Sequence, residues 1–353
     1  MCCRLIRAFI AMALGAVWSL SSLTANAATS GGASEIEPPL NAETQMIMKE
    51  HAQMWEAFVK TCPYNFTNMV TAQEVAVFRD CLATKFWPRL LDKHHHEYKV
   101  TIESKLIAGV KTEIISPSMG IAAGNRQRVL INVHGGSFAV GGRWIGQLES
   151  IPVAATGKIR IVSIDYRMAP EYKFPAASDD VLAVYRALLK EYRPANIGIY
   201  GTSAGATLTA EVVALMTKEK VPLPGAIGMF CAAAWPLASG KELAKGTYGY
   251  FQESDASNPA AFPGLAPETM KQFPDSLLIS ATGDGGINNV VRTHSQLVAL
   301  GVSTDLHVWE GLDHAFFYYA DFPESRQVYD VIAYFFDKHL GKHDMAVVPR
   351  KAG

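Results

Sequence analysis

The stretch Asn196-Ile-Gly-Ile-Tyr-Gly201-Thr202-Ser203-Ala204-Gly205 decides the fold class of this chain. Its apolar first half predicts a buried strand, and a helix-forming run over residues 206–218 follows at once. Between them, Gly-x-Ser-x-Gly predicts a sharp turn whose backbone leaves no room for side chains at the two glycines. Such a turn pushes the Ser203 hydroxyl out above the sheet and aims the helix N-terminus at the same point. The context therefore predicts that Ser203 is a nucleophile.

Two later loops supply the partners that a nucleophilic serine needs, which are a base to take its proton and a carboxylate to orient the base. The apolar run 276–281 predicts a strand with Asp284 on the loop after it, and the run 304–309 predicts another strand that leads to His314. Both residues then lie at the carboxyl edge of the sheet, level with Ser203 and in the chain order Ser, Asp, His. We therefore predict a catalytic triad of Ser203, Asp284 and His314. A serine in an ordinary glycine-rich turn is the alternative.

A second glycine-rich loop, His134-Gly-Gly-Ser-Phe138, follows a strand predicted over residues 129–133. Glycine lets the backbone turn its N–H groups toward a substrate oxygen with no Cβ in the way. The loop therefore predicts an oxyanion hole. Its candidate donors are the backbone N–H groups of Gly135, Gly136, Ser137 and of Ala204, the residue after the nucleophile.

These motifs resemble those of the hormone-sensitive-lipase branch of the α/β-hydrolases, the microbial esterases with an HGGG-type loop. The matching pieces lie within residues 125–320 and are His134-Gly-Gly-Ser-Phe138, Asp165-Tyr-Arg-Met-Ala-Pro-Glu171, Gly201-Thr-Ser-Ala-Gly205, the Asp284 loop and Glu310-Gly-Leu-Asp-His314. The resemblance implies an α/β-hydrolase fold, with a mostly parallel eight-stranded sheet, helices on both faces and a helical cap. It places the oxyanion donors at Gly136, Ser137 and Ala204.

The resemblance also implies that the run from Asp165 to Glu171 braces the catalytic loops rather than touching substrate. Two residues depart from the family pattern. Ser137 stands where the family has the third glycine of its loop, and Thr202 stands where many members have an acidic residue. Both departures bear on substrate preference and leave the catalytic groups in place.

Together these features predict a serine carboxylesterase that acts on short- to medium-chain carboxylic esters through an acyl-enzyme. A small-molecule ester is the expected partner, and neither a metal nor an organic cofactor is expected. An acyltransferase, an amidase or a lactonase on the same triad is the nearest alternative, because different acceptors compete for one acyl-enzyme. A non-catalytic binding homologue is the remaining one.

Strands and helices alternate from about residue 125, which favours one mostly parallel sheet with helices on both faces. We expect a helical cap segment over 28–97, a catalytic domain over 98–345, and a second cap excursion over 236–273 inside it. Together the two cap regions would roof the active site. The aromatic residues predicted at its rim are Trp144, Trp235, Tyr248, Tyr250 and Phe251.

The N-terminus reads as a secretory signal peptide over residues 1–27, with Arg4 and Arg7 before a short apolar run and Ala25-Asn-Ala27 as the cleavage site. An uncleaved membrane anchor is the alternative. We therefore expect an exported protein, periplasmic or secreted, with no stable membrane span after cleavage. In an oxidising compartment Cys62 and Cys81 can form a disulfide or stay free, and the spacing leaves both open. Cys231 is expected to be an inert core thiol.

The run His94-His-His96 invites a metal site, but consecutive side chains point in different directions and no carboxylate or cysteine stands at ligand spacing. We interpret it as a solvated linker between cap and core. The formal net charge of the 353-residue chain is -1, which gives no bias toward nucleic acid. The sequence leaves the oligomeric state open.

Overall fold

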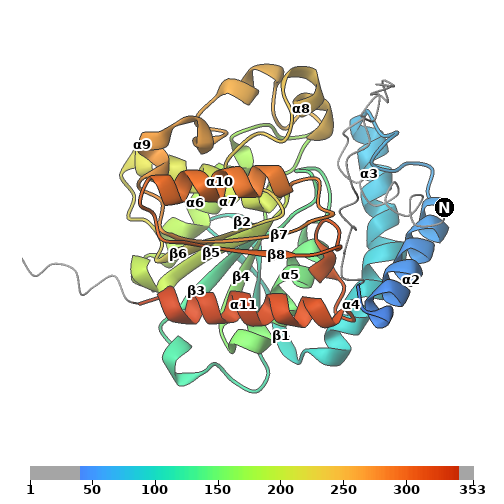
Figure 1. Cartoon of the computed structure of the whole chain (residues 1–353), viewed down its shortest axis with the longest axis horizontal. Coiled ribbons are helices and arrows are strands. Elements are labelled where there is room, and N and C mark those ends of the chain that lie inside the picture. The colour runs from blue at the N-terminus through green and yellow to red at the C-terminus, as the bar shows by residue number, and fades with distance from the viewer. Residues whose placement is uncertain (1–39, 342–353) are drawn as a thin grey trace, which may run out of the picture.

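The computed structural model describes residues 40–341. A central eight-stranded sheet carries helices on both faces, which confirms the predicted architecture (Figure 1). Its order is β1-β2-β4-β3-β5-β6-β7-β8. The first two strands form an antiparallel hairpin, β2 also pairs antiparallel with β4, and β3 to β8 run parallel to one another. The strands are β1 (Val100–Ile107), β2 (Val110–Pro117), β3 (Val129–Val133), β4 (Arg160–Asp165), β5 (Ile197–Thr202), β6 (Ala226–Phe230), β7 (Asp275–Ala281) and β8 (Thr304–Trp309).

Two layers of helices cover the sheet. One layer holds α6 (Ala176–Leu188), α7 (Ala204–Glu219) and α10 (Ile287–Ala299), and the other holds α5 (Arg143–Gly157) and α11 (Pro323–His339) (Figure 1). Because both faces are covered, β3, β5 and β6 are buried at every position. Their parallel carboxyl ends meet at one edge, which is where the predicted catalytic loops begin.

The segment 40–97 packs as helices against one end of this core (Figure 1). It holds α2 (Ala42–Val59), α3 (Ala72–Cys81), a π-helical turn (Leu82–Phe86) and α4 (Trp87–Glu97). Two polar caps fix the helix starts. The Asn41 side chain accepts from the Thr44 N–H, and Thr71 forms a capping box with Glu74. The boundaries predicted at 28–97 and 98–345 stay predictions, and residues 28–39 lie outside the described part.

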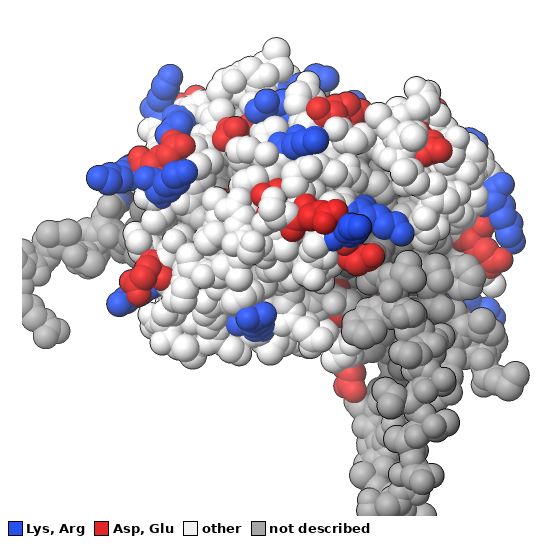
Figure 2. All heavy atoms as spheres, turned by 90° about the horizontal axis from the view of Figure 1, so that it is seen from above, with Lys and Arg blue, Asp and Glu red and all other residues white. Residues whose placement is uncertain are grey.

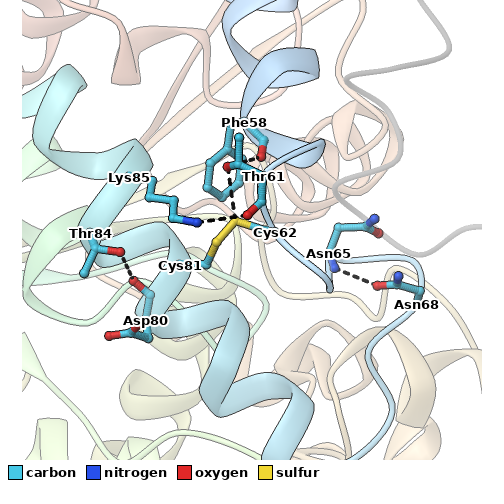
Figure 3. Close-up of a disulfide and its surroundings, with 9 residues drawn as sticks. All are labelled: Phe58, Thr61, Cys62, Asn65, Asn68, Asp80, Cys81, Thr84 and Lys85. Carbon is cyan, nitrogen blue, oxygen red and sulfur yellow. Dashed lines mark hydrogen bonds between the residues drawn. A yellow bond between two sulfur atoms is a disulfide. The ribbon is translucent and has the colours of Figure 1, made fainter.

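Cys62 and Cys81 are joined by a disulfide, one of the two outcomes that the sequence left open (Figure 3). The bond ties the loop after α2 to the end of α3. Lys85, one helical turn beyond Cys81, donates to the Thr61 carbonyl oxygen at 2.9 Å, so a hydrogen bond reinforces the same junction (Figure 3). Cys231 is free and buried, as expected.

The three histidines are not a linker, contrary to our interpretation. They form the last turn of α4, where His94 is fully buried and its Nδ1 lies 2.9 Å from the Leu90 carbonyl oxygen. Burial lowers the pKa of His94 to about 4. His95 and His96 face solvent. The amphipathic period of α4 continues through the histidines, because His94 lies one turn after the buried Leu90 and Leu91.

The remaining helices, α8 (Gly240–Gly246) and α9 (Pro267–Met270), belong to the segment 236–273 that follows β6. On the face seen in Figure 2, basic and acidic side chains are interspersed over the described residues. Among residues 40–341, no helix combines the length and the apolar character needed to cross a bilayer. The predicted signal peptide lies outside the described residues.

Candidate active site

Ser203 stands at the junction of β5 and α7, with a backbone φ of 57° that side chains rarely adopt. The two glycines of the motif explain the turn. A Cβ on Gly201 would lie 2.2 Å from the Val133 carbonyl oxygen, and one on Gly205 would lie 1.8 Å from the same atom. The chain can therefore make this turn only with glycine on both sides. Ser203 is 7% exposed and lines a cavity at the carboxyl edge of the sheet.

His314 and Asp284 form a hydrogen-bonded pair beside that cavity. His314 Nδ1 lies 2.7 Å from Asp284 Oδ1, and the carboxylate also accepts from the Gly286 N–H and the Ser280 hydroxyl. Burial alone would raise the pKa of Asp284, but the charge and hydrogen bond of His314, with the other two donors, hold it below its ordinary value. An ionised Asp284 fixes the tautomer of His314 and leaves Nε2 for a reacting group.

Ser203 and His314 line the same cavity, although within the described residues no hydrogen bond joins their side chains. Catalytic hydrogen bonds are often long without substrate and tighten in the complex. The structure thus brings the three predicted residues to one edge of the sheet, each on the loop where the sequence put it.

The loop after β3 turns sharply at Gly136, with φ of 107°, and at Ser137, with φ of 53°. Both residues line the same cavity as Ser203. No described residue accepts a hydrogen bond from the Gly136 or Ser137 N–H, so both remain candidate oxyanion donors. Ala204 is the first residue of α7, where the N–H has no acceptor within the helix.

Gly135 was wrongly included among the candidate donors. Its N–H donates to Glu149 Oε1 at 3.0 Å and is therefore turned away from the cavity. Two residues near the site were not predicted from the sequence. One is Glu149, and the other is Tyr318, which lines the cavity and donates to Glu149. The one available signal was a glutamate in α5, where the other residues, apart from Arg143 and Gln147, are apolar or small.

The run from Asp165 to Glu171 packs behind these loops. The Tyr166 hydroxyl donates to the His134 carbonyl oxygen at 2.9 Å, and its ring stacks on the His134 ring at 4.1 Å. The Ala169 N–H donates to the Phe138 carbonyl oxygen at 2.8 Å. None of these residues lines the cavity, which agrees with a bracing role.

The cavity has a volume of about 140 Å³ and is mostly aromatic. Besides Gly136, Ser137, Ser203 and His314, its lining residues are His51, Trp55, Phe66, Phe86, Trp87, Leu90, Ile145, Ala315, Tyr318 and Tyr319. Six of them, from His51 to Leu90, belong to the segment 40–97. That segment closes one side of the site.

The segment 236–273 contributes no residue to this lining, so the prediction that both cap regions roof the site is wrong for the second. Tyr250 and Phe251 are buried in an aromatic cluster with Phe138, where the Tyr250 ring stacks on Phe138 at 4.4 Å. Tyr248, Trp144 and Trp235 also lie outside the lining. The Tyr248 hydroxyl donates to the Phe66 carbonyl oxygen, and Trp144 packs against the core. The Trp235 indole N–H donates to Gln296.

Within the described residues, one group of potential metal ligands has its donor atoms within 4.8 Å of one another, and it consists of Cys231, Asp284 and His314. Two of its members already hydrogen bond to each other, and the Cys231 sulfur accepts from the Ala315 N–H at 3.4 Å. Burial raises the pKa of the Cys231 thiol well above its usual value, which disfavours the thiolate that metals bind. The histidines of α4 do not join any such group among residues 40–341.

Comparison with known proteins agrees with the geometry. A family model described as "alpha/beta hydrolase fold" matches residues 130–318, more than half of the chain. The chain is 26% identical to an acetyl-hydrolase of Streptomyces hygroscopicus over 241 residues, which cover 61% of this chain and 77% of the relative.

Two solved structures extend the likeness. The crystal structure of esterase E25 aligns with a TM-score of 0.71 and 28% identity, covering 82% of this chain and 94% of the other. An esterase from the bacterial hormone-sensitive lipase family aligns with a TM-score of 0.68 and 22% identity, covering 82% and 96%. The chain therefore belongs to the α/β-hydrolase fold family, and proteins named esterases are among those that it is similar to.

Proposed function

We propose that this chain is a serine carboxylesterase that hydrolyses short- to medium-chain esters through Ser203, His314 and Asp284. The relatives named acetyl-hydrolase and esterase support the coarser statement, a carboxylic ester hydrolase. One observation supports the finer statement, which names the catalytic triad. A single cavity holds Ser203, a histidine paired with an ionised aspartate, and two backbone N–H groups without acceptors.

In the proposed reaction His314 Nε2 takes the Ser203 proton as Ser203 Oγ attacks the ester carbonyl carbon. Asp284 holds the imidazole and stabilises the imidazolium that forms. The N–H groups of Gly136, Ser137 and Ala204 then donate hydrogen bonds to the carbonyl oxygen and stabilise the negative charge that develops on it. His314 returns the proton to the leaving alcohol, and water attacks the acyl-enzyme with His314 again as base.

The size of the cavity supports a small acyl or alcohol group. Its volume of about 140 Å³ is close to that of an apolar protein cavity of about 150 Å³ that binds benzene. The aromatic lining offers apolar contacts, so the part of the substrate inside it should be apolar.

The test is hydrolysis of p-nitrophenyl esters from acetate to palmitate by the wild-type protein and by Ser203→Ala. We expect a maximum of kcat/KM at short chains and a loss of at least about 10⁴-fold in kcat for the variant. Activity that is indifferent to Ser203 would refute the proposed mechanism, and a maximum at palmitate would refute the proposed chain length.

We also propose that the protein is exported to the periplasm or secreted. The disulfide between Cys62 and Cys81 supports this, since such bonds persist in oxidising compartments. Sequencing of the N-terminus of the mature protein tests it. Cleavage after Ala27 is the expected result, and a chain recovered with its first residues intact would contradict it.

A further inference from the structure

Glu149 is a buried carboxylate that the proposed reaction does not use. It lies on α5 and is 3% exposed. Its Oε1 accepts from the Gly135 N–H at 3.0 Å and from the Tyr318 hydroxyl at 2.6 Å, and its Oε2 accepts from the Asn132 side-chain amide at 2.6 Å. All three partners donate hydrogen bonds to Glu149. Together they are arranged to stabilise a carboxylate at a position buried from solvent.

The three donors come from the parts of the chain that form the site. Asn132 lies on β3, just before the glycine-rich loop, and Gly135 directly precedes the candidate donor Gly136. Tyr318 follows His314 by four residues and lines the cavity. One side chain thus connects the loop that would bind the oxyanion with the loop that carries the base.

The two loops are in direct contact at this point. A Cβ on Gly135 would lie 2.6 Å from the Tyr318 hydroxyl oxygen and 2.9 Å from the carbonyl oxygen of Thr202, the residue before Ser203. Glycine at 135 therefore allows the loop to approach Tyr318 closely enough for both to share Glu149. A small shift of either loop would break one of the bonds.

We propose that Glu149 is a positioning residue that holds the oxyanion loop and the His314 loop in register, so that Gly136, Ser137 and His314 face the same reacting carbonyl. The inference rests on the proposed esterase function. Burial raises the pKa of Glu149 to about 7, while the bonds from Tyr318, Asn132 and Gly135 act in the opposite direction. The donors thus offset part of the cost of burying the charge.

The first test is Glu149→Gln, which keeps the shape of the side chain. Its new amide N–H₂ would face the N–H₂ of Asn132, two donors with no acceptor between them. We expect kcat to fall by about 10- to 100-fold with KM within twofold of the wild-type value, a smaller loss than that of an oxyanion donor itself. Affinity for a trifluoromethyl ketone, which mimics the tetrahedral intermediate, should fall in parallel.

The double variant Asn132→Asp with Glu149→Gln separates positioning from mere structural damage. The new carboxylate at 132 would accept from the new amide at 149 and still accept from the Ser163 hydroxyl, which bonds to Asn132 Oδ1 at 3.0 Å in the wild type. Recovery of at least tenfold in kcat is the expected result. If kcat of the double variant does not exceed kcat of Glu149→Gln, the hydrogen bond between positions 132 and 149 does not set the rate and the proposal fails.

Glu113→Gln is the matched control. Glu113 is also a buried glutamate, bonded to Gln147 on α5 at 2.7 Å, but it touches neither loop. Its kcat should stay within twofold of the wild-type value. If Glu149→Gln does not fold, Tyr318→Phe removes one of the three bonds and should lower kcat with KM unchanged.

The outcomes distinguish a failure of the positioning role from a failure of the proposed function. Full kcat in a folded Glu149→Gln or Tyr318→Phe variant, with Ser203→Ala inactive, overturns the positioning role alone. Activity that survives Ser203→Ala overturns the proposed function and the inference with it.

Discussion

Two aromatic-rich segments, 40–97 and 236–273, lie outside the strand-helix core. Their aromatic side chains occupy different environments. In the first, Trp55, Phe66, Phe86 and Trp87 line the cavity with Ser203. In the second, Tyr250 and Phe251 are buried against Phe138 of the loop after β3, and Phe262 packs on Phe251. Similar composition thus lines the cavity in one segment and supports the loop after β3 in the other.

Phe251 and Phe66 form a matched pair of phenylalanines, one from each segment. Phe251→Ala should lower the free energy of unfolding by about 3–5 kcal/mol, because Phe251 is 1% exposed and its removal leaves a cavity. The ratio of kcat/KM for butyrate to octanoate esters should stay within twofold. Phe66→Ala, on the half-buried cavity wall, should instead change that ratio. Denaturant unfolding and ester kinetics on both variants check this, and a reversed pattern would break the distinction.

The turn at Ser203 and the loops that carry Asp284 and His314 could be predicted because their causes are local. Gly201 and Gly205 flank Ser203 since the Val133 carbonyl oxygen leaves no space for a Cβ at either position. Asp284 and His314 follow apolar runs that form β7 and β8, and parallel strands end at one edge. Each signal lies within a few residues of the group that it positions.

Three features could not be predicted, because they depend on contacts between residues far apart in the sequence. They are the acceptor of the Gly135 N–H, the face of the segment 40–97 that lines the cavity, and the packing of Tyr250 and Phe251. The acceptor of the Gly135 N–H is Glu149, on the helix after the loop, and Tyr318, near the other end of the domain, donates to the same carboxylate oxygen. The sequence predicts a helical segment over 28–97 but not which of its faces meets the cavity. The packing of Tyr250 and Phe251 on Phe138 likewise arises only from the tertiary fold, which is why these residues were misplaced at the rim.

The disulfide belongs to the first segment alone, so its loss should affect the cap before the core. Replacing both Cys62 and Cys81 by Ser should lower the free energy of unfolding by about 2–4 kcal/mol, because the closed loop spans 19 residues. KM should rise as the cavity wall loosens. Adding a reductant to the wild type should reproduce the effect, and adding it to the double variant should change nothing. An unchanged KM in both cases would mean that the cap is held by packing alone.

Trp55 tests whether the first segment limits the acyl chain. Trp55→Ala should shift the ratio of kcat/KM for octanoate to butyrate by about tenfold toward octanoate, since a few added methylene contacts are worth on the order of 1–3 kcal/mol. Trp144→Ala is the control, because Trp144 is also partly buried but lies outside the cavity lining. A similar shift in both variants would mean that a general loosening, and not the cavity wall, sets the preference.

The smallest effect is expected where the first segment is fastened to the catalytic domain by charge. Asp321 accepts from His51 of α2 at 3.1 Å and pairs with Lys93 of α4. Burial would raise the pKa of Asp321, but the bonds and charges of His51 and Lys93 lower it far below its usual value. A carboxyl group with a lowered pKa adds stability above the unfolded value of about 3.9 and loses it as the pH falls further.

Lys93→Ala should therefore cost at most about 1 kcal/mol at pH 7, because Lys93 is half exposed and water screens its charge. The difference from the wild type should stay constant down to about pH 5 and narrow at lower pH, because Asp321 of the folded variant, which lacks Lys93, takes up its proton before Asp321 of the folded wild type does. Unfolding curves from pH 7 to pH 3 measure it. Lys60→Ala is the control, because among the described residues Lys60 forms an ion pair with Glu56 of α2 alone. Equal losses for the two lysines would mean that the contact to Asp321 does not fasten the cap, leaving the aromatic packing and the disulfide to hold the cavity wall in place.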